Sequence, residues 1–135
     1  MNRRGVAMVG ASTVLIAGLV TAGIAHAKSA EETGQPRGQF ELTVTHGSGT
    51  PTAVTLTCDP TAGDHPHAEA ACADLAKVNG QIQNIAPKEG EMCPHYVSPV
   101  RATAVGRWES TPINYDHTFT NGCEMARATG AVFDF

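Results

Sequence analysis

The sequence lacks the features on which several large classes of function depend. Lysine and arginine number nine against 13 acidic residues, and they are scattered along the 135-residue chain. Such a chain offers no basic surface to nucleic acid or to an anionic membrane. No C-x-x-C and no glycine-rich phosphate loop occurs, so a zinc cluster, a thioredoxin-type redox centre and a phosphate cradle have no support. The length also excludes a multidomain enzyme.

The sequence also lacks the groups of residues that are typical of catalytic sites. There is no G-x-S-x-G nucleophile elbow, and His46–Gly49 has the composition of a polar turn. Asp64–His67 holds three potential metal ligands, but neighbours on one loop cannot close a tetrahedral shell without a remote fourth ligand. Paired carboxylates occur at Glu31–Glu32 and at Glu89 and Glu91, where solvated charge explains them. We therefore expect no enzymatic activity, no cofactor and no metal site.

The first 27 residues have the pattern of an export signal. A basic head, Met1–Arg4, precedes an uncharged run, Val6–Ile24, and Ala25-His26-Ala27 is an A-x-A cleavage site. A membrane anchor is the alternative, but the run contains several glycines and ends without a basic stop-transfer cluster. We expect cleavage after Ala27 and a mature chain that is secreted, extracellular and free of the membrane.

Four cysteines, an even number, lie in the mature part: Cys58, Cys72, Cys93 and Cys123. In a small exported domain this count indicates two disulfides. Three pairings are possible, and the compact one joins Cys58 to Cys72 and Cys93 to Cys123. Each bridge would contribute about 3 to 4 kcal/mol on the loop-entropy estimate, a large share of the stability of so small a domain.

Alternating apolar residues predict strands at the start of the mature domain. Residues 28–38 are polar and are expected to form a disordered N-terminal arm, so that the domain spans residues 39–135. Apolar and polar residues alternate over 40–44 and again over 54–58, on either side of a Gly-Ser-Gly turn. This arrangement is typical of a β-hairpin.

The chain beyond the hairpin is expected to add a helix and more strands. Residues 59–66 are expected to form a loop. Residues 68–78 are expected to form an alanine-rich helix, which would hold the second cysteine near the end of the preceding strand. Alternation over 100–104 predicts a strand that ends in a turn at 105–106, and Trp108 begins the next one.

Two more strands would complete the sheet. One spans residues 113–119, after an interruption at 110–112, and a short one spans 131–135. The pattern gives four or five antiparallel strands with one sizeable helix, which is an α+β fold whose sheet covers the helix on one face.

The segment Glu91–Pro99 is unusual because it has a cysteine near its start, prolines at two positions and bulky side chains between these prolines. Pro94 favours extended backbone at Cys93, and a disulfide there would tie the segment to the body of the domain. A rigid, extended, exposed peptide is what a serine protease cleft accepts. If it is held so stiffly that the cut ends cannot separate, it inhibits the protease. A plain disulfide-anchored connection is the alternative.

A longer motif carries a resemblance to a known family. It begins at the first cysteine and, with its outer blocks, resembles the Streptomyces subtilisin inhibitor family over Phe40–Phe135. The matching residues are Cys58-x-Pro60-x-x-Gly63-x-His65-Pro66-x-x-x-x-Ala71-Cys72-Ala73-x-Leu75, then Met92-Cys93-Pro94, Pro99-Val100, Trp108, Tyr115, Asn121-x-Cys123-Glu124-Met125 and Val132-Phe133-x-Phe135.

The resemblance implies a five-stranded antiparallel sheet with two helices packed on one face, the two disulfides of the compact pairing, and a homodimer through the sheet. It also implies a secreted protein that inhibits subtilisin-like serine proteases in a substrate-like manner. The reactive bond would then be His95-Tyr96, with His95 as the primary specificity residue and Asn121 supporting the loop from behind. The residues preceding the reactive pair would be Met92, Cys93 and Pro94.

His95 and Tyr96 depart from the family, which commonly has Met, Lys or Arg followed by Val at these positions. Histidine is too short and too weakly charged to replace lysine or arginine in a trypsin pocket, so we expect subtilisin-like targets with a broad apolar pocket. The bulky ring of Tyr96 keeps an alternative open. In that alternative, the chain is a secreted binding module that retains the scaffold but does not inhibit.

Overall fold

A computed structural model of the chain describes residues 34–135. The expected signal segment, residues 1–27, and the first part of the expected arm, residues 28–33, lie outside the described residues. Within residues 34–135, no helix has the length and apolar character needed to cross a membrane.

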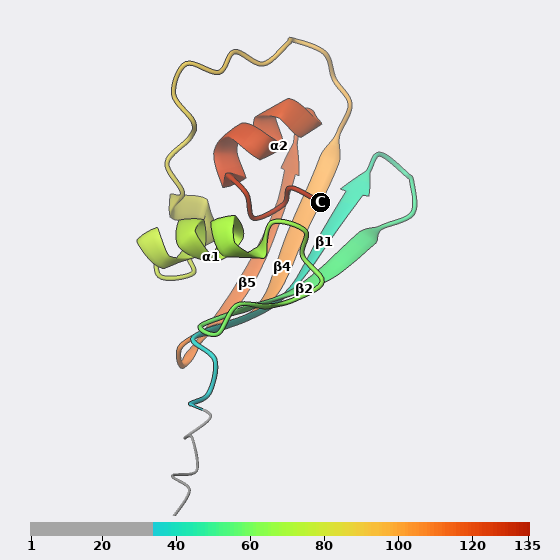
Figure 1. Ribbon diagram of the computed structural model, residues 1–135. Helices are drawn as coiled ribbons and strands as arrows, with labels where there is room; N and C mark the ends of the chain where they lie inside the picture. Colours follow the sequence, from blue (N-terminus) through green and yellow to red (C-terminus); the bar gives the residue numbers. More distant parts are fainter. Residues whose placement is uncertain (1–33) are drawn as a thin grey trace, which may run out of the picture. The chain divides into compact units, whose positions relative to one another are not determined.

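The domain is built on one five-stranded antiparallel sheet (Figure 1). Its strands lie in the order β3-β2-β1-β4-β5, so that β5 and the two-residue β3 are its edges. The central strand β1 pairs with β2 on one side and with β4 on the other. The strands are β1 (Gly38–His46), β2 (Thr52–Cys58), β3 (Ala62–Gly63), β4 (Val100–Trp108) and β5 (Thr111–Phe119).

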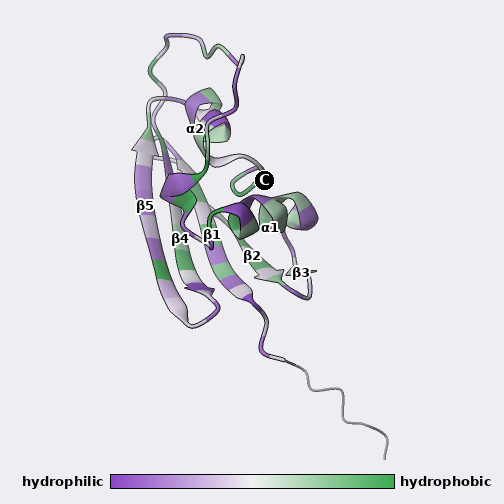
Figure 2. Ribbon diagram, turned by 90° about the vertical axis from the view of Figure 1, so that its left-hand side faces the viewer, coloured by the Kyte–Doolittle hydropathy of each residue, from purple (hydrophilic) through white to green (hydrophobic). Residues whose placement is uncertain are grey.

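Two α-helices pack on the inner face of this sheet. They are α1 (Ala68–Lys77) and α2 (Gly122–Thr129), and a 3-10 turn, η1 (Ile82–Asn84), follows the first. Leu75 of α1 and Met125 of α2 belong to the same buried cluster as the inward side chains of the strands. Figure 2 shows the sheet with α1 near β2 and α2 near the end of β4 and β5. The predicted α+β class, with two helices on one face of a five-stranded sheet and two disulfides, is confirmed.

The core follows directly from the alternation in the sequence. Phe40, Leu42 and Val44 of β1 are buried, while their neighbours along the strand face outward. On β4, Ala102 and Ala104 are fully buried, because small side chains there let the layer above approach the sheet. The outer face carries mainly threonines and charged residues.

The expected turn at 105–106 is wrong, because β4 runs unbroken to Trp108 and the hairpin turn comes at Glu109 and Ser110. Gly106 instead allows β4 to lie close to β1. A Cβ atom at this position would lie 2.0 Å from the carbonyl oxygen of Gln39 on β1. A glycine inside an alternating pattern can therefore mark a strand contact as well as a turn.

The expected strand over 131–135 is also wrong. The residues before it form α2, whose first turn is capped by Asn121, and the chain after Gly130 folds back as irregular backbone. Val132 and Phe133 are nevertheless buried and belong to the core. The fifth strand of the sheet is instead β3, inside the segment that was expected to be loop.

The expected disordered arm extends too far toward the domain. Gly38 is the first residue of β1, and Arg37 already has both backbone groups engaged: its N–H donates to Asp59 O at 3.3 Å, and its carbonyl accepts from Glu109 N at 2.5 Å. Ordered structure therefore begins before residue 39.

Candidate functional site

The chain between η1 and β4 is the most exposed part of the described domain. Residues 85–99 contain neither helix nor strand, and all except Ile85 and Cys93 are exposed. In Figure 1 this segment arches past α2 at one end of the sheet. Four large apolar side chains are exposed within residues 34–135, and three of them lie here: Met92 at 95%, Tyr96 at 51% and Val97 at 78%. Clustered exposed apolar side chains mark a surface that meets a partner.

The second disulfide anchors this segment on its N-terminal side. Cys93 is bonded to Cys123 in the first turn of α2, with 5.6 Å between the Cα atoms. The first disulfide, Cys58–Cys72, joins the end of β2 to α1 and has no part in the loop. The two bonds are the pairs expected from the cysteine spacing.

Backbone hydrogen bonds anchor the segment at its other end. The N–H of Ser98 donates to the carbonyl of Thr120 at 2.9 Å, and the N–H of Gly47 donates to the carbonyl of Pro99 at 2.8 Å. Sequence reasoning missed these anchors, because any residue type can make a backbone hydrogen bond and the sequence carries no signal for it.

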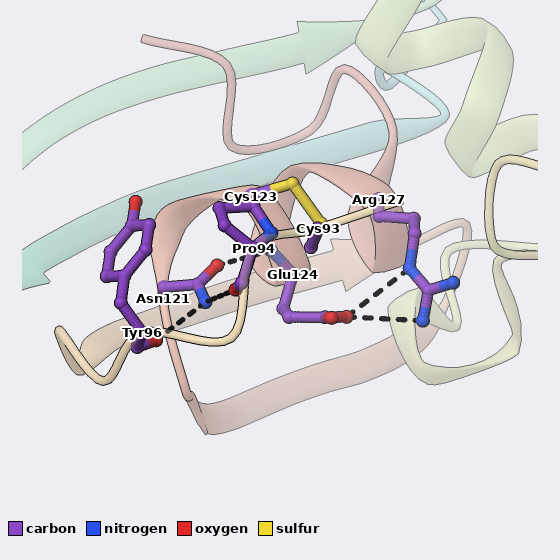
Figure 3. The surroundings of a disulfide bond; sticks show 7 residues. All are labelled: Cys93, Pro94, Tyr96, Asn121, Cys123, Glu124 and Arg127. Carbon is purple, nitrogen blue, oxygen red and sulfur yellow. Dashed lines mark hydrogen bonds and ion pairs between the residues drawn. A yellow bond between two sulfur atoms is a disulfide. The ribbon is translucent and has the colours of Figure 1, made fainter. Parts of the chain in front are cut away.

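Asn121 holds the loop from behind. It is 1% exposed, and its side-chain amide donates to the carbonyl oxygen of Pro94 at 3.2 Å and to that of Tyr96 at 3.0 Å (Figure 3). The two carbonyls stand on either side of His95, so one amide group fixes the backbone immediately before and after this residue. A buried amide with both donors satisfied is a rigid support.

The same side chain also starts helix α2. Its Oδ1 accepts from the backbone N–H of Glu124 at 3.0 Å, which makes Asn121 the N-cap residue. Glu124 in turn pairs with Arg127, at 3.2 Å (Figure 3). An Asn followed three residues later by Glu is a recognisable helix start, and this signal could have located α2 in the sequence.

His95 itself is exposed. It lines a hollow together with Pro94, His117, Asn121 and Glu124, among others. Tyr96, the next residue, has its ring pointing away from Asn121 while its carbonyl points toward the amide (Figure 3). The structure thus brings together all the residues that the sequence singled out for the loop: Met92, Cys93, Pro94, His95, Tyr96 and Asn121.

The potential metal ligands of the 64–67 loop have protein partners instead. Asp64 accepts from the backbone and side chain of Thr55, and the backbone hydrogen bond lowers its pKa. His65 is buried, and its Nδ1 accepts from the backbone N–H of His67 at 3.0 Å, so Nε2 carries the proton that binds Val132 O. No group of three such side chains in residues 34–135 has the geometry to hold a metal ion.

Comparison with known proteins decides the family. Residues 37–121 match the family model described as subtilisin inhibitor-like. The chain belongs to this family. The matched region contains β1 to β5, the loop and its supporting asparagine.

Individual relatives extend the match over the whole chain. A subtilase-type protease inhibitor of Streptomyces fradiae is 37% identical, over 99% of this chain and 99% of its own length. A subtilisin inhibitor of Streptomyces albogriseolus is 44% identical over 62% of this chain and 58% of its own length. Among solved structures, sermetstatin of Streptomyces caespitosus in complex with Bacillus licheniformis subtilisin aligns with a TM-score of 0.59 and 34% identity, covering 73% of this chain and 98% of its own.

Proposed function

We propose that the chain is a secreted inhibitor of subtilisin-like serine endopeptidases and that its reactive bond is His95-Tyr96. The observation that carries the proposal is the amide of Asn121, which binds the carbonyls of Pro94 and Tyr96 and so fixes both sides of an exposed residue. The relatives named as protease inhibitors and the structural neighbour bound to subtilisin support the same function.

The mechanism follows from the anchoring. The protease serine attacks the carbonyl carbon of His95, the bond to the nitrogen of Tyr96 breaks, and an acyl-enzyme forms with the amine of Tyr96 as the leaving group. The Cys93–Cys123 bond holds the chain before the cut, and the Ser98–Thr120 hydrogen bond holds it after the cut. The amine therefore stays beside the acyl group, at a high effective concentration, and re-forms the peptide bond. The enzyme remains occupied.

The loop binds tightly because it needs little further ordering. A flexible peptide loses backbone and side-chain entropy when it enters a cleft, which weakens its binding. Here the disulfide, the amide of Asn121 and the backbone anchors hold the loop before the protease arrives. The side chain of His95 is left to enter the primary specificity pocket, and Met92 and Tyr96 add apolar contact area.

Export and dimerisation complete the proposal. Two disulfides in a domain of this size suit an oxidising, extracellular compartment, in agreement with the signal pattern of residues 1–27.

The open face of the sheet carries Val105, 59% exposed, among threonines such as Thr43 and Thr103. We place the homodimer contact on this face, which leaves the loop at the end of the sheet free for the protease.

Titration of the oxidised mature chain against subtilisin tests the function. We expect stoichiometric loss of activity on a chromogenic substrate, and an Asn121→Ala variant that inhibits only briefly before it is cut. Asn84→Ala, which changes an exposed asparagine outside the loop, is the matched control and should inhibit like the wild type. Undiminished protease activity at molar excess of the wild type would contradict the proposal and favour the non-inhibitory binding module.

A further inference from the structure

Asn121 is followed by glycine, and this dipeptide has a chemistry of its own. The backbone nitrogen after an asparagine can attack the side-chain amide carbon, and glycine permits this best because it has no Cβ to hinder the approach. The described residues contain two such pairs, Asn79-Gly80 and Asn121-Gly122. Since the function assigned above to Asn121 depends on its amide group, loss of that group would alter the loop.

The two pairs have opposite surroundings. Asn79 is exposed, in a turn just after α1, with φ of 51°. Asn121 is 1% exposed, and its amide makes three hydrogen bonds, two of them to the loop. Attack by the nitrogen of Gly122 requires the amide to rotate away from these partners. The nitrogen of Gly80 is itself engaged, because it donates to the carbonyl of Leu75 at 2.9 Å. Both reactions therefore need a local opening: release of the loop contacts at Asn121, and fraying of the end of α1 at Asn79.

We propose that Asn121-Gly122 is a deamidation site whose reactivity is controlled by the state of the loop. The expected loss of inhibition rests on the proposed function, whereas the deamidation of Asn121 does not. The nitrogen of Gly122 forms a bond to Cγ of Asn121, the Cγ–Nδ2 bond breaks, and ammonia leaves with the proton of the Gly122 N–H. Water then opens the cyclic imide to give aspartate or isoaspartate. No oxidation or reduction takes place.

Opening of the loop removes the protection. The carbonyls of Pro94 and Tyr96 hold the amide only while the loop is anchored at both ends, and a cut at His95-Tyr96 leaves both anchors in place. Once Cys93 is released from Cys123, the amide loses partners that keep it in place. The protein thus contains an ageing step that the anchored loop holds back: an anchored loop keeps the asparagine, and a released loop loses it.

The aspartate product would keep the fold and lose the support. An aspartate at position 121 still accepts from the N–H of Glu124 and remains a good N-cap for α2. It has no N–H to donate to the two loop carbonyls, and its charge faces their oxygen atoms. We therefore expect the aged chain to be a substrate of the protease rather than a durable inhibitor.

Gly122 and Gly80 provide the matched variants. A Cβ atom at Gly122 would meet nothing within 4 Å, so Gly122→Ala fits the fold and hinders the attack. Gly80 has φ of +76°, and a Cβ there would lie 2.5 Å from Trp108, so this pair is left unchanged as an internal clock. Its asparagine reports the rate of a site away from the loop in the same sample.

The experiment incubates the wild type, Gly122→Ala and a Cys93→Ser/Cys123→Ser variant at mildly alkaline pH and follows deamidation by peptide mass mapping. In the wild type we expect Asn121 to react at least about tenfold more slowly than in the variant without the second disulfide, equivalent to about 1.4 kcal/mol of local opening, while the rate at Asn79 is the same in both. Protease-nicked wild type, in which both anchors remain, should protect Asn121 like the intact chain. Gly122→Ala should keep Asn121 in every state.

Two results would overturn the proposal. One is an equal rate at Asn121 in the intact wild type and in the variant without the second disulfide, and the other is a rate at Asn79 that rises as much as the rate at Asn121 in that variant. The Asn121→Asp variant checks the consequence: it should retain its helix content by circular dichroism and inhibit subtilisin only temporarily, and durable inhibition would contradict this step. A wild type that does not inhibit at all would refute the proposed function, while the deamidation rates in the disulfide variant would still be informative.

Discussion

At the scale of single residues, the loop depends on side chains with separate tasks. Asn121 sets the backbone position, whereas His95 is exposed and, in the proposed function, meets the partner. We therefore expect that specificity can be changed at His95 without disturbing the support. This separation is why the sequence, which predicted both residues to lie in one site, still left the target enzyme open.

Replacement of His95 by lysine should redirect the inhibitor. A lysine carries a fixed charge on a long stem, which suits the acidic pocket of trypsin-like enzymes, whereas histidine is shorter and weakly charged. We expect His95→Lys to gain trypsin inhibition by at least about tenfold, which is about 1.4 kcal/mol. His46→Lys, at an exposed histidine outside the loop, should gain none. No gain for His95→Lys with an unchanged circular dichroism spectrum would mean that the reactive bond lies elsewhere.

Asp74 provides a pH-dependent contact in the body of the domain. Partial burial opposes its charge, but the N–H of Ala131, at 3.0 Å, and Lys77, at 3.0 Å, outweigh this, and the pKa of Asp74 is lowered. A lowered folded-state pKa adds stability above the unfolded-state value of about 4, and this stability is lost as the pH falls through the folded-state value. The carboxylate thus stabilises the link between α1 and the chain after α2 at neutral pH.

We expect Asp74→Asn to unfold more easily than the wild type at pH 7, by about 1 to 2 kcal/mol. This lies at the lower end of the range for a hydrogen bond to a charged group, about 1.5 to 3 kcal/mol, because asparagine keeps an acceptor oxygen. The difference should shrink below about pH 4, where the wild-type carboxyl takes up its proton. Urea unfolding at several pH values measures it. A difference that stays constant or grows in acid would show that the charge is not the cause.

At the scale of elements, each disulfide serves a different part of the molecule. Cys58–Cys72 fixes α1 to β2 in the core, and Cys93–Cys123 fixes the loop to α2. The sequence separations, 14 and 30 residues, correspond to about 3 and about 4 kcal/mol of loop entropy. The energies are similar, but the consequences for function are not.

Removal of the two bonds should therefore separate stability from inhibition. We expect Cys93→Ser/Cys123→Ser to lose durable inhibition while its remaining core still folds, and Cys58→Ser/Cys72→Ser to lose stability while its folded fraction still inhibits. Thermal unfolding and inhibition of subtilisin, measured on both variants, make the comparison. Equal loss of inhibition in the two variants at a temperature where both are folded would contradict this division.

Regular apolar spacing in the sequence predicted some elements correctly and others wrongly. The hairpin of β1 and β2 and the helix α1 follow from regular apolar spacing. The long β4 was divided because Gly106 resembles a turn residue, although it is required by the approach of Gln39. The chain after Gly130 looked like a strand, because alternating apolar residues can also be buried in irregular backbone.

At the scale of the whole molecule, the exposed large apolar side chains of the described residues lie on two surfaces, the loop and the open face of the sheet. Met92, Tyr96 and Val97 lie on the loop, and Val105 lies on β4 with its side chain on the outer face. The two surfaces are separate, so a dimer formed through the sheet leaves two loops available. This arrangement predicts two proteases bound to each dimer.

The dimer is testable by one substitution. Val105→Asp places a charge in the middle of the open face, where the site is exposed and the fold tolerates it. We expect the wild type to sediment as a dimer and the variant as a monomer, with subtilisin inhibition unchanged. His46→Ala, at an exposed residue away from Val105, is the control. Thr55→Asp on the outer face of β2 is not suitable as a control, because Thr55 binds Asp64. A monomeric wild type at micromolar concentration would refute the sheet contact.

The most direct test of the central claim is the equilibrium between the intact and the cut chain. Catalytic amounts of subtilisin are incubated with the mature protein, and separately with its purified nicked form, until the composition is constant. We predict one cut, at His95-Tyr96, with the two fragments joined by Cys93–Cys123, and the same ratio of intact to nicked chain from both directions. Cleavage at another bond, or nicked chain that never regains the intact mass, would contradict the account.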